Sequence, residues 1–242
     1  MRILLTGHKG FIGTELFNQL KTAGYTVYGF DLKEGKDICN SPFEYEVDLV
    51  IHLAGRSGVR ESLKNAATYW HVNVEGTKRI FDVFKDTRII YASSSSAYEP
   101  HLNPYAASKY LIERAAEKHS NALGVRLHTV YSDIPREGMF FDKLFNNKLE
   151  YTTPHKRDFI HLDDVCDAFK LLIESKLKGV VDVGSGYSVN IQDIAPNLPV
   201  RLNTPHERKC TEANIKELSN LGFKPKYTIE KFLTNKGIEH KI

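Results

Sequence analysis

Three glycines follow a short apolar run near the start of the chain, in the segment TGHKGFIG at residues 6–13. Between a predicted strand and a predicted helix, this spacing lets the backbone turn tightly and lets free N–H groups face a pyrophosphate. The triplet also occurs in plain strand-turn-helix units, so its surroundings must decide. If this segment is a dinucleotide site, the chain must fold as an α/β protein built on a parallel sheet. Cofactor contacts are then expected from Gly7, Lys9, Gly10, Phe11, Ile12 and Gly13.

An acidic residue, Asp31, ends the second apolar run, eighteen residues after Gly13. A carboxylate at this point accepts hydrogen bonds from both ribose hydroxyls of NAD and repels the 2′-phosphate of NADP. Lys9, Lys33 and Lys36 are placed to meet such a phosphate, which keeps NADP open as the alternative. The pattern favours NAD as the cofactor.

Short apolar runs alternate with helical periodicity through the first half of the chain. Candidate strands cover residues 2–6, 26–31, 49–53, 88–92 and 124–130, and candidate helices cover 13–23, 70–84 and 105–120. This alternation predicts an α/β fold with a doubly wound parallel sheet of the Rossmann type over residues 1–131. Frequent prolines and short helices near 163–176 and 212–221 then predict a small C-terminal substrate-binding lobe over 132–242, from which about 158–185 could rejoin the sheet.

The composition narrows the class of protein. Hydrophobic residues make up 41% of the 242, which is enough for a sizeable core, and the formal net charge is only +3. Because charge is spread without a run of one sign, binding to nucleic acid or to an anionic membrane is not expected. No apolar stretch approaches the roughly 20 residues of a membrane span, so we expect a cytoplasmic protein. Three cysteines without CxxC spacing indicate neither disulfides nor a metal site, and we expect buried, unreactive thiols.

Tyr105 and Lys109 are four residues apart at the start of a predicted helix, which places them on one face. A cation beside a phenol favours the phenolate, so Lys109 is expected to lower the pKa of Tyr105 and make it a base. The serine-rich run at 93–96 leaves a predicted strand at its carboxyl end, where open α/β sheets bind ligands. The alternative is a solvated helix start beside a serine-rich turn.

Further motifs follow in order along the chain: KDI (36–38), VIHLAG (50–55), NVEGT (73–77), YASSSSAY (91–98), PYAASK (104–109) and RDFIHLDD (157–164). With TGHKGFIG they resemble the extended short-chain dehydrogenase/reductase family, in particular its NAD-dependent nucleotide-sugar epimerases and dehydratases. The resemblance implies catalysis by Ser94, Tyr105 and Lys109, and a pyrophosphate contact from Arg157. It also implies cofactor contacts at Asp31, Asp37, Ile38, Leu53, Ala54, Gly55, Asn73, Ala92, Tyr105 and Lys109.

Within that family, GRSGVRES (55–62), TVY (129–131) and Arg136 look most like the UDP-glucuronate and UDP-N-acetylhexosamine 4-epimerases. The 4,6-dehydratases carry an Asp-Glu pair after the catalytic serine, where this chain has Ser95 and Ser96, so dehydration is not expected. The resemblance implies an NAD-dependent enzyme that epimerises C4 of a UDP-sugar through a 4-keto intermediate. Substrate contacts are expected at Arg56, Ser94, Thr129, Arg136 and Arg157.

Two alternatives remain open. One is a 4-ketoreductase that reduces a GDP- or TDP-4-keto-6-deoxy sugar with NAD(P)H. The other is a non-catalytic dinucleotide-binding protein, because 31–48 and 94–105 are short for the family. The helices at 70–84 and 105–120 resemble the pair that joins family homodimers, so a homodimer is expected, with its seam at Leu111, Ile112, Ala115 and Ala116.

Overall fold

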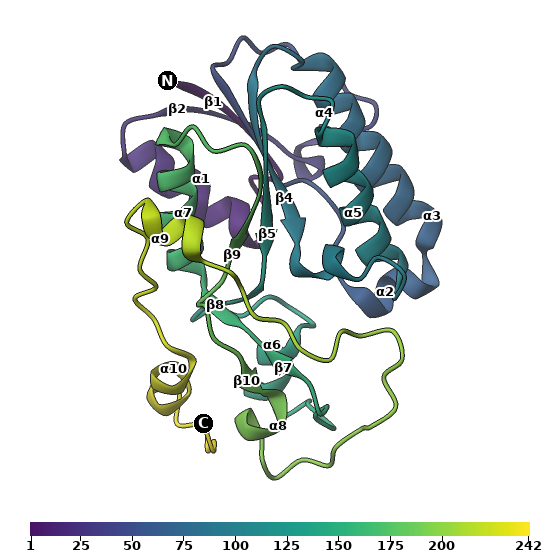
Figure 1. Ribbon diagram of the computed structural model, residues 1–242, viewed down its shortest axis with the longest axis vertical. Helices are drawn as coiled ribbons and strands as arrows, with labels where there is room; N and C mark the ends of the chain where they lie inside the picture. The colour runs from purple at the N-terminus through teal and green to yellow at the C-terminus, as the bar shows by residue number, and fades with distance from the viewer.

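Six parallel strands form the central sheet in the computed structural model, which describes residues 1–242 (Figure 1). Their order across the sheet is β2-β1-β3-β4-β5-β9, and every pairing is parallel. The predicted doubly wound α/β sheet is therefore confirmed. The strands are β1 (Arg2–Thr6), β2 (Thr26–Phe30), β3 (Leu49–His52), β4 (Arg88–Ser94), β5 (Ala122–Leu127) and β9 (Gly179–Val183).

Helices cover both faces of this sheet. On one face, α1 (Phe11–Thr22) and α7 (Leu162–Glu174) pack Leu16 and Phe169 against Ile3 and Leu5. On the other face, α4 (Thr77–Val83) and α5 (Pro104–Ala116) cover Leu4 and its neighbours. The two faces alternate along β1 because successive strand side chains point to opposite sides.

The edge of the sheet at β2 reflects a short connection. Residues 35–48 form no strand, and only the 3-10 turn η1 (Leu32–Glu34) follows β2. Aromatic residues of this connection, Phe43 and Tyr45, pack on Phe30 instead. The sixteen residues between Asp31 and Asp48 leave no room for a further helix and strand, so β2 is an edge strand.

The helix predicted at 70–84 is more complex than expected. Short helices α2 (Val59–Lys64) and α3 (Ala66–Tyr69) precede a π-helical stretch, η2 (Trp70–Gly76), which runs directly into α4. Such wider turns inside helices are frequent at functional sites. Within this stretch Val74 is buried, whereas Trp70 is 51% exposed, so its apolar side chains do not share one face.

The C-terminal part adds two small sheets and a third core. β6 (Thr129–Tyr131) pairs with β8 (Phe159–His161), and β7 (Lys156–Arg157) pairs with β10 (Val189–Asn190). Helices α6 (Phe140–Phe145), α8 (Ile191–Ile194) and α10 (Ile229–Asn235) pack with them around Phe141 and Phe232. By contrast, α7 and β9 belong to the central sheet and its cover, and α9 (Lys216–Asn220) packs Leu218 there.

Two expectations at this level are wrong. The strand predicted at 124–130 divides at His128, whose N–H bonds to the Val183 carbonyl, while the N–H of Thr129 bonds to the Asp158 carbonyl. The chain changes sheets there because its partners change.

The second wrong expectation concerns the cysteines. Only Cys166 is buried; Cys39 is half-buried and Cys210 is exposed. In addition, no helix has both the length and the apolar character needed to cross a membrane.

Candidate active site

The glycine segment forms a backbone cradle at the carboxyl end of β1. Gly7 has a φ of 73°, and a Cβ there would lie 2.6 Å from the Ala54 nitrogen. A Cβ on Gly13 would lie 2.0 Å from the Gly7 carbonyl oxygen, so α1 starts directly against the loop. Gly10 is the N-cap, and no side chain caps the first turn, at Phe11. The unpaired N–H groups of this helix start suit a pyrophosphate.

Asp31 lies beside this cradle, held by backbone N–H groups. Its carboxylate oxygens accept from the N–H of Lys9 and the N–H of Lys33, both at 2.9 Å. The Lys9 ammonium lies 2.8 Å from Glu34, and that of Lys33 donates to the Lys9 carbonyl at 3.0 Å. The cations that an NADP phosphate would need are thus engaged with oxygens of the chain, whereas Asp31 keeps lone pairs for ribose hydroxyls.

The predicted adenine contacts, Asp37 and Ile38, lie in the connection after η1. The Asp37 carboxylate accepts from the Cys39 N–H at 2.9 Å, and the Ile38 carbonyl accepts from Arg79 at 2.9 Å. Ile38 is buried against Gly76, where a Cβ would lie 2.8 Å from its side chain. The connection is therefore fixed to η2 and α4.

A buried histidine fixes the strand ends beside the glycine cradle. The two ring nitrogens of His52 lie 2.7 Å from the Thr6 hydroxyl and 2.9 Å from the Thr77 hydroxyl. Burial, followed by the charge of Lys109, lowers the pKa of His52 to about 3, so the ring is neutral. The N–H groups of Leu53 and Ala54 then bond to Thr6, which holds the predicted nicotinamide-facing segment.

Asn73 holds the next residues of that segment. Its amide oxygen accepts from the Arg56 N–H at 2.7 Å, and its amide nitrogen donates to the Arg56 carbonyl and the Ser108 hydroxyl, both at 2.9 Å. A Cβ on Gly55 would lie 3.0 Å from the same amide oxygen. These bonds use the Asn73 amide to fix the backbone at Gly55 and Arg56, and the predicted cofactor contact of Asn73 stays a prediction.

Tyr105 lies near Ser94, as predicted. Tyr105 is the second residue of α5, whose N-cap Asn103 accepts from the Ala106 N–H at 2.8 Å. Ser94 ends β4, and its hydroxyl oxygen accepts from the Ser96 N–H at 3.1 Å, which leaves its proton to donate. Burial raises the pKa of Tyr105, whereas the Ser94 hydroxyl and the Arg136 charge lower it.

Lys109 is buried and lies one turn after Tyr105. Its ammonium donates to the Ala92 carbonyl at 2.7 Å. Burial lowers the pKa of Lys109 to about 8, and the charge of Glu113 opposes that shift. The groups that lower the pKa of Tyr105 in this structure are Ser94 and Arg136, and the expected effect of Lys109 on the phenol stays a prediction. Lys109 instead ties α5 to the end of β4.

Glu113, which the sequence analysis did not single out, extends this arrangement by another turn. Its buried carboxylate accepts from the Ser93 hydroxyl and from Arg126 at 2.9 and 2.7 Å. Tyr105, Lys109 and Glu113 are spaced four residues apart, so they share one face of α5. Continuing the Tyr-Lys spacing by four residues would have found Glu113.

A cluster of arginines lies where the C-terminal part meets the sheet. The Arg157 side chain is only 15% exposed, donates to the Lys156 carbonyl and lies 3.8 Å from Glu207. Arg60 of α2 bonds to the same Glu207, and Arg208 bonds to Glu99 at 3.0 Å and to the Ser95 carbonyl at 2.7 Å. Neither Arg60 nor Arg208 was among the expected substrate contacts.

The other predicted substrate contacts lie in different settings. Arg136 donates to the Ser57 hydroxyl at 2.6 Å and is near enough to Tyr105 to shift its pKa. Arg56 has its backbone held by Asn73 and its side chain exposed. Thr129 lies in β6, half-buried. Among the predicted substrate arginines, Arg136 is therefore the one whose charge reaches Tyr105.

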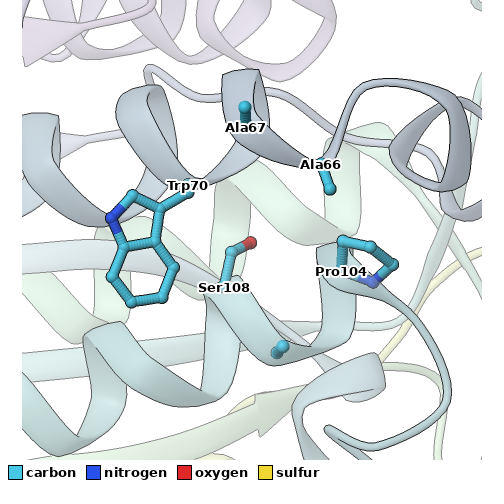
Figure 2. A pocket seen from close by; sticks show the side chains of 6 residues that line it. Ala66, Ala67, Trp70, Pro104 and Ser108 are labelled. Carbon is cyan, nitrogen blue, oxygen red and sulfur yellow. The ribbon is translucent and has the colours of Figure 1, made fainter.

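An apolar depression lies outside this site, between α3 and α5 (Figure 2). Trp70 forms one side and is 51% exposed. The other residues that line the depression are small or cyclic: Ala66, Ala67, Pro104, Ala107 and Ser108.

Residues 3–184 match the model of the NAD dependent epimerase/dehydratase family. The chain belongs to this family. UDP-glucuronate 4-epimerase of Thermodesulfobacterium geofontis is 28% identical over 76% of this chain and 75% of its own. The structure of UDP-glucuronic acid 4-epimerase from Bacillus cereus, in complex with UDP-glucuronic acid and NAD, has a TM-score of 0.85 at 26% identity, covering 98% of each chain.

Dehydratases share the fold as well. DesIV, a dTDP-glucose 4,6-dehydratase from Streptomyces venezuelae with NAD and TYD bound, has a TM-score of 0.86 at 19% identity and covers 98% of this chain and 95% of its own. The family is NAD-dependent, which agrees with the cradle at Gly7 and the carboxylate of Asp31. The chain is thus an NAD-dependent family member, and the site must distinguish epimerisation from other reactions.

Proposed function

We propose that this protein is a 4-epimerase that inverts C4 of a UDP-sugar through a 4-keto intermediate. The observation that carries the proposal is the meeting of Tyr105, Ser94 and Lys109 at the carboxyl end of β4. The residues after Ser94, Ser95 and Ser96, offer no carboxylic acid that could expel a hydroxyl as water. A proton shuttle without a second acid fits reversible oxidation at one carbon.

Tyr105 is the base in this proposal. Its phenolate takes the proton of the C4 hydroxyl and becomes the phenol, which returns the proton after the sugar has turned. The chemistry that NAD supplies when bound is reversible hydride exchange with C4. Because the pKa of Tyr105 is raised by burial, the phenolate needs the Ser94 hydroxyl and the Arg136 charge, which lower that pKa.

Ser94 and Lys109 position the oxygen and the base. The Ser94 hydroxyl donates its one proton to the Tyr105 phenolate before proton transfer. Once Tyr105 is protonated, that hydroxyl donates to the C4 oxygen as negative charge develops there. Lys109 fixes α5, and so Tyr105, to the Ala92 carbonyl next to the predicted nicotinamide position. The largely buried guanidinium of Arg157 would take the substrate's diphosphate, since a planar guanidinium suits bidentate phosphate binding.

The experiment that tests this function follows C4 itself. Protein purified with NAD is incubated with UDP-glucuronate or UDP-N-acetylglucosamine, without added cofactor, and the products are resolved by NMR. Conversion to the C4 epimer with no net NADH supports the proposal. Stoichiometric reduction of a 4-keto GDP- or TDP-sugar by NAD(P)H would instead support a ketoreductase.

A homodimer is part of the proposal, but with a different seam from the one expected. Ile112 and Ala116 pack on their own sheet, so they are not free to meet a partner. The depression between α3 and α5 offers exposed Trp70 and a floor of small side chains instead (Figure 2). Because the side chains beside Trp70 are small, a second copy of the chain can come close to this depression. This supports a two-fold symmetric contact between the two depressions.

A further inference from the structure

One loop of the C-terminal part carries a carboxylate into the arginine cluster. We call residues 201–209 the strap. Its ends are tied to one short segment, by bonds between Arg201 and Thr152 and between Lys209 and Lys156. Between these ties it leaves the C-terminal part and returns below α2 (Figure 1). The strap therefore presents its inner residues to the sheet domain while its ends stay fixed.

Glu207 of the strap lies among side-chain nitrogens from two places in the chain, α2 and the segment 155–157. Its first carboxylate oxygen accepts from Arg60 at 3.0 and 3.1 Å. Its second lies 3.4 Å from the His155 ring and 3.8 Å from Arg157. The side chains of Glu207, Arg157 and His155 are 18, 15 and 3% exposed, whereas that of Arg60 is 59% exposed, so the anion position is buried on the side of Arg157 and open on the side of Arg60.

A phosphate would use the same donors. Guanidinium groups bind carboxylate and phosphate oxygens in the same bidentate way, so the two anions compete for Arg60 and Arg157. With Glu207 present, its negative charge also repels an incoming phosphate. An external anion can gain these arginines only if Glu207 leaves them.

We propose that Glu207 is an internal competitor for the substrate's phosphate groups, and that binding exchanges its carboxylate for phosphate and frees the strap. The inference rests on the proposed function, because it takes the arginine cluster as the diphosphate site. In this inference Glu207 controls how tightly the nucleotide binds. That role is separate from those of Tyr105, Ser94 and Lys109.

The neighbours of Glu207 connect the strap to the catalytic residues. The His206 carbonyl accepts from Asn103, the N-cap of the helix that carries Tyr105, at 3.0 Å. Arg208 donates to the Ser95 carbonyl, next to Ser94. Before substrate binds, these two hydrogen bonds hold the strap to Asn103 and to Ser95. Release of the strap therefore breaks both bonds.

The test compares wild type with Glu207→Gln, which keeps the side-chain shape and removes the charge. UDP binding to the NAD-loaded proteins is measured by calorimetry. We expect Glu207→Gln to bind UDP about tenfold more tightly, since one repulsive and competing charge is gone. Glu212→Gln is the matched control, because Glu212 is exposed and bonds only to Ser188; its affinity should stay within about twofold of wild type.

Hydrogen exchange supplies a second readout. UDP should speed amide exchange over residues 202–208 in wild type, and these amides should already exchange faster in Glu207→Gln without UDP. Equal or weaker UDP binding by Glu207→Gln overturns the inference while leaving the proposed function intact. If UDP binds to neither protein although NAD does, the nucleotide-sugar function fails, and the inference fails with it.

Discussion

Lys109 and Glu113 lie one turn apart on the same buried face of α5, and each ties the helix to the end of β4. Lys109 donates to the Ala92 carbonyl at 2.7 Å, and Glu113 accepts from the hydroxyl of the next residue, Ser93. The pair thus brackets the backbone that leads into Ser94. Burial lowers the pKa of Lys109, and the negative charge of Glu113 raises it, so Glu113 partly offsets the effect of burial on the ammonium.

Glu113→Gln should lower the pKa of Lys109 below its value of about 8, because the neighbouring negative charge is removed. The charged and titratable groups that act on Lys109 or respond to it are Glu113 of α5 and His52 of β3, and Arg126 of β5 binds Glu113. NMR titration of the labelled Lys109 side chain measures the shift. Glu117→Gln, at an exposed position of the same helix, is the control, and equal shifts in both variants would contradict the account.

The sign of the pH effect on stability follows from the same residue. The pKa of Lys109 is about 8 when folded and 10.5 in its ordinary state. Between these values the unfolded chain binds more protons, so this group makes stability rise with pH. As pH rises across this range, the free energy of unfolding should increase more for wild type than for Lys109→Met. If the two free energies changed in parallel with pH, the result would argue against a buried Lys109.

Asp31 sets the cofactor preference. Its carboxylate is held by two backbone N–H groups, and Lys9 is engaged by Glu34. We expect calorimetry to show NAD binding at least about tenfold more tightly than NADP, which corresponds to about 1.4 kcal/mol. Asp31→Asn should narrow this ratio by removing the charge that repels the 2′-phosphate. NADP binding as tightly as NAD to wild type would be inconsistent with this role.

Asp158 is a buried structural carboxylate between β7 and β8. It accepts from the Ser185 N–H and hydroxyl, the Gly186 N–H and the Ala213 N–H, at 2.6 to 3.0 Å. Asp158→Asn should cost roughly 2–4 kcal/mol in the free energy of unfolding, because an amide cannot accept all of these bonds. Chemical denaturation checks this, with exposed Asp86→Asn as the control; equal stabilities would refute the role.

The proposed dimer makes the protein's one tryptophan a reporter. Sedimentation at micromolar concentration should give about twice 27.5 kDa, and Trp70→Glu should give a monomer. Dilution of wild type should shift Trp70 fluorescence to the red as its half-exposed ring loses the partner. A mass near 27.5 kDa for wild type would rule the dimer out.

The sequence predicted the parts of the fold that are local. The glycine spacing, the strand runs and the Tyr105–Lys109 pair each depend on a few neighbouring residues, and all lie in the elements expected of them. The strand that divides at His128 and the π-helical stretch around Asn73 depend on distant partners, Val183 and Ser108. Periodicity carries no record of such contacts.

The same limit applies to the site. The positions of Tyr105, Ser94 and Lys109 could be predicted, but the charge that favours the phenolate could not. It comes from Arg136, which follows β6, a strand that pairs with β8 outside the central sheet. Glu207 likewise reaches Arg60 across 147 positions of the chain.

The central claim is that Tyr105 moves the C4 proton while NAD is restored in each cycle. The most direct test uses purified protein that retains NAD, a UDP-sugar and no added cofactor, with epimers quantified by NMR and NADH followed by absorbance. Tyr110→Phe, which changes an exposed tyrosine of the same helix, is the matched control for Tyr105→Phe.

The account predicts that wild type and Tyr110→Phe equilibrate the C4 epimers with no net NADH. Tyr105→Phe should lose about 10² to 10⁴ in rate while still binding NAD, because a general base is missing. Ser94→Ala should lose less, since it removes one hydrogen bond to developing charge. Unchanged epimerisation by Tyr105→Phe, or no epimerisation of any UDP-sugar by wild type, would contradict the account.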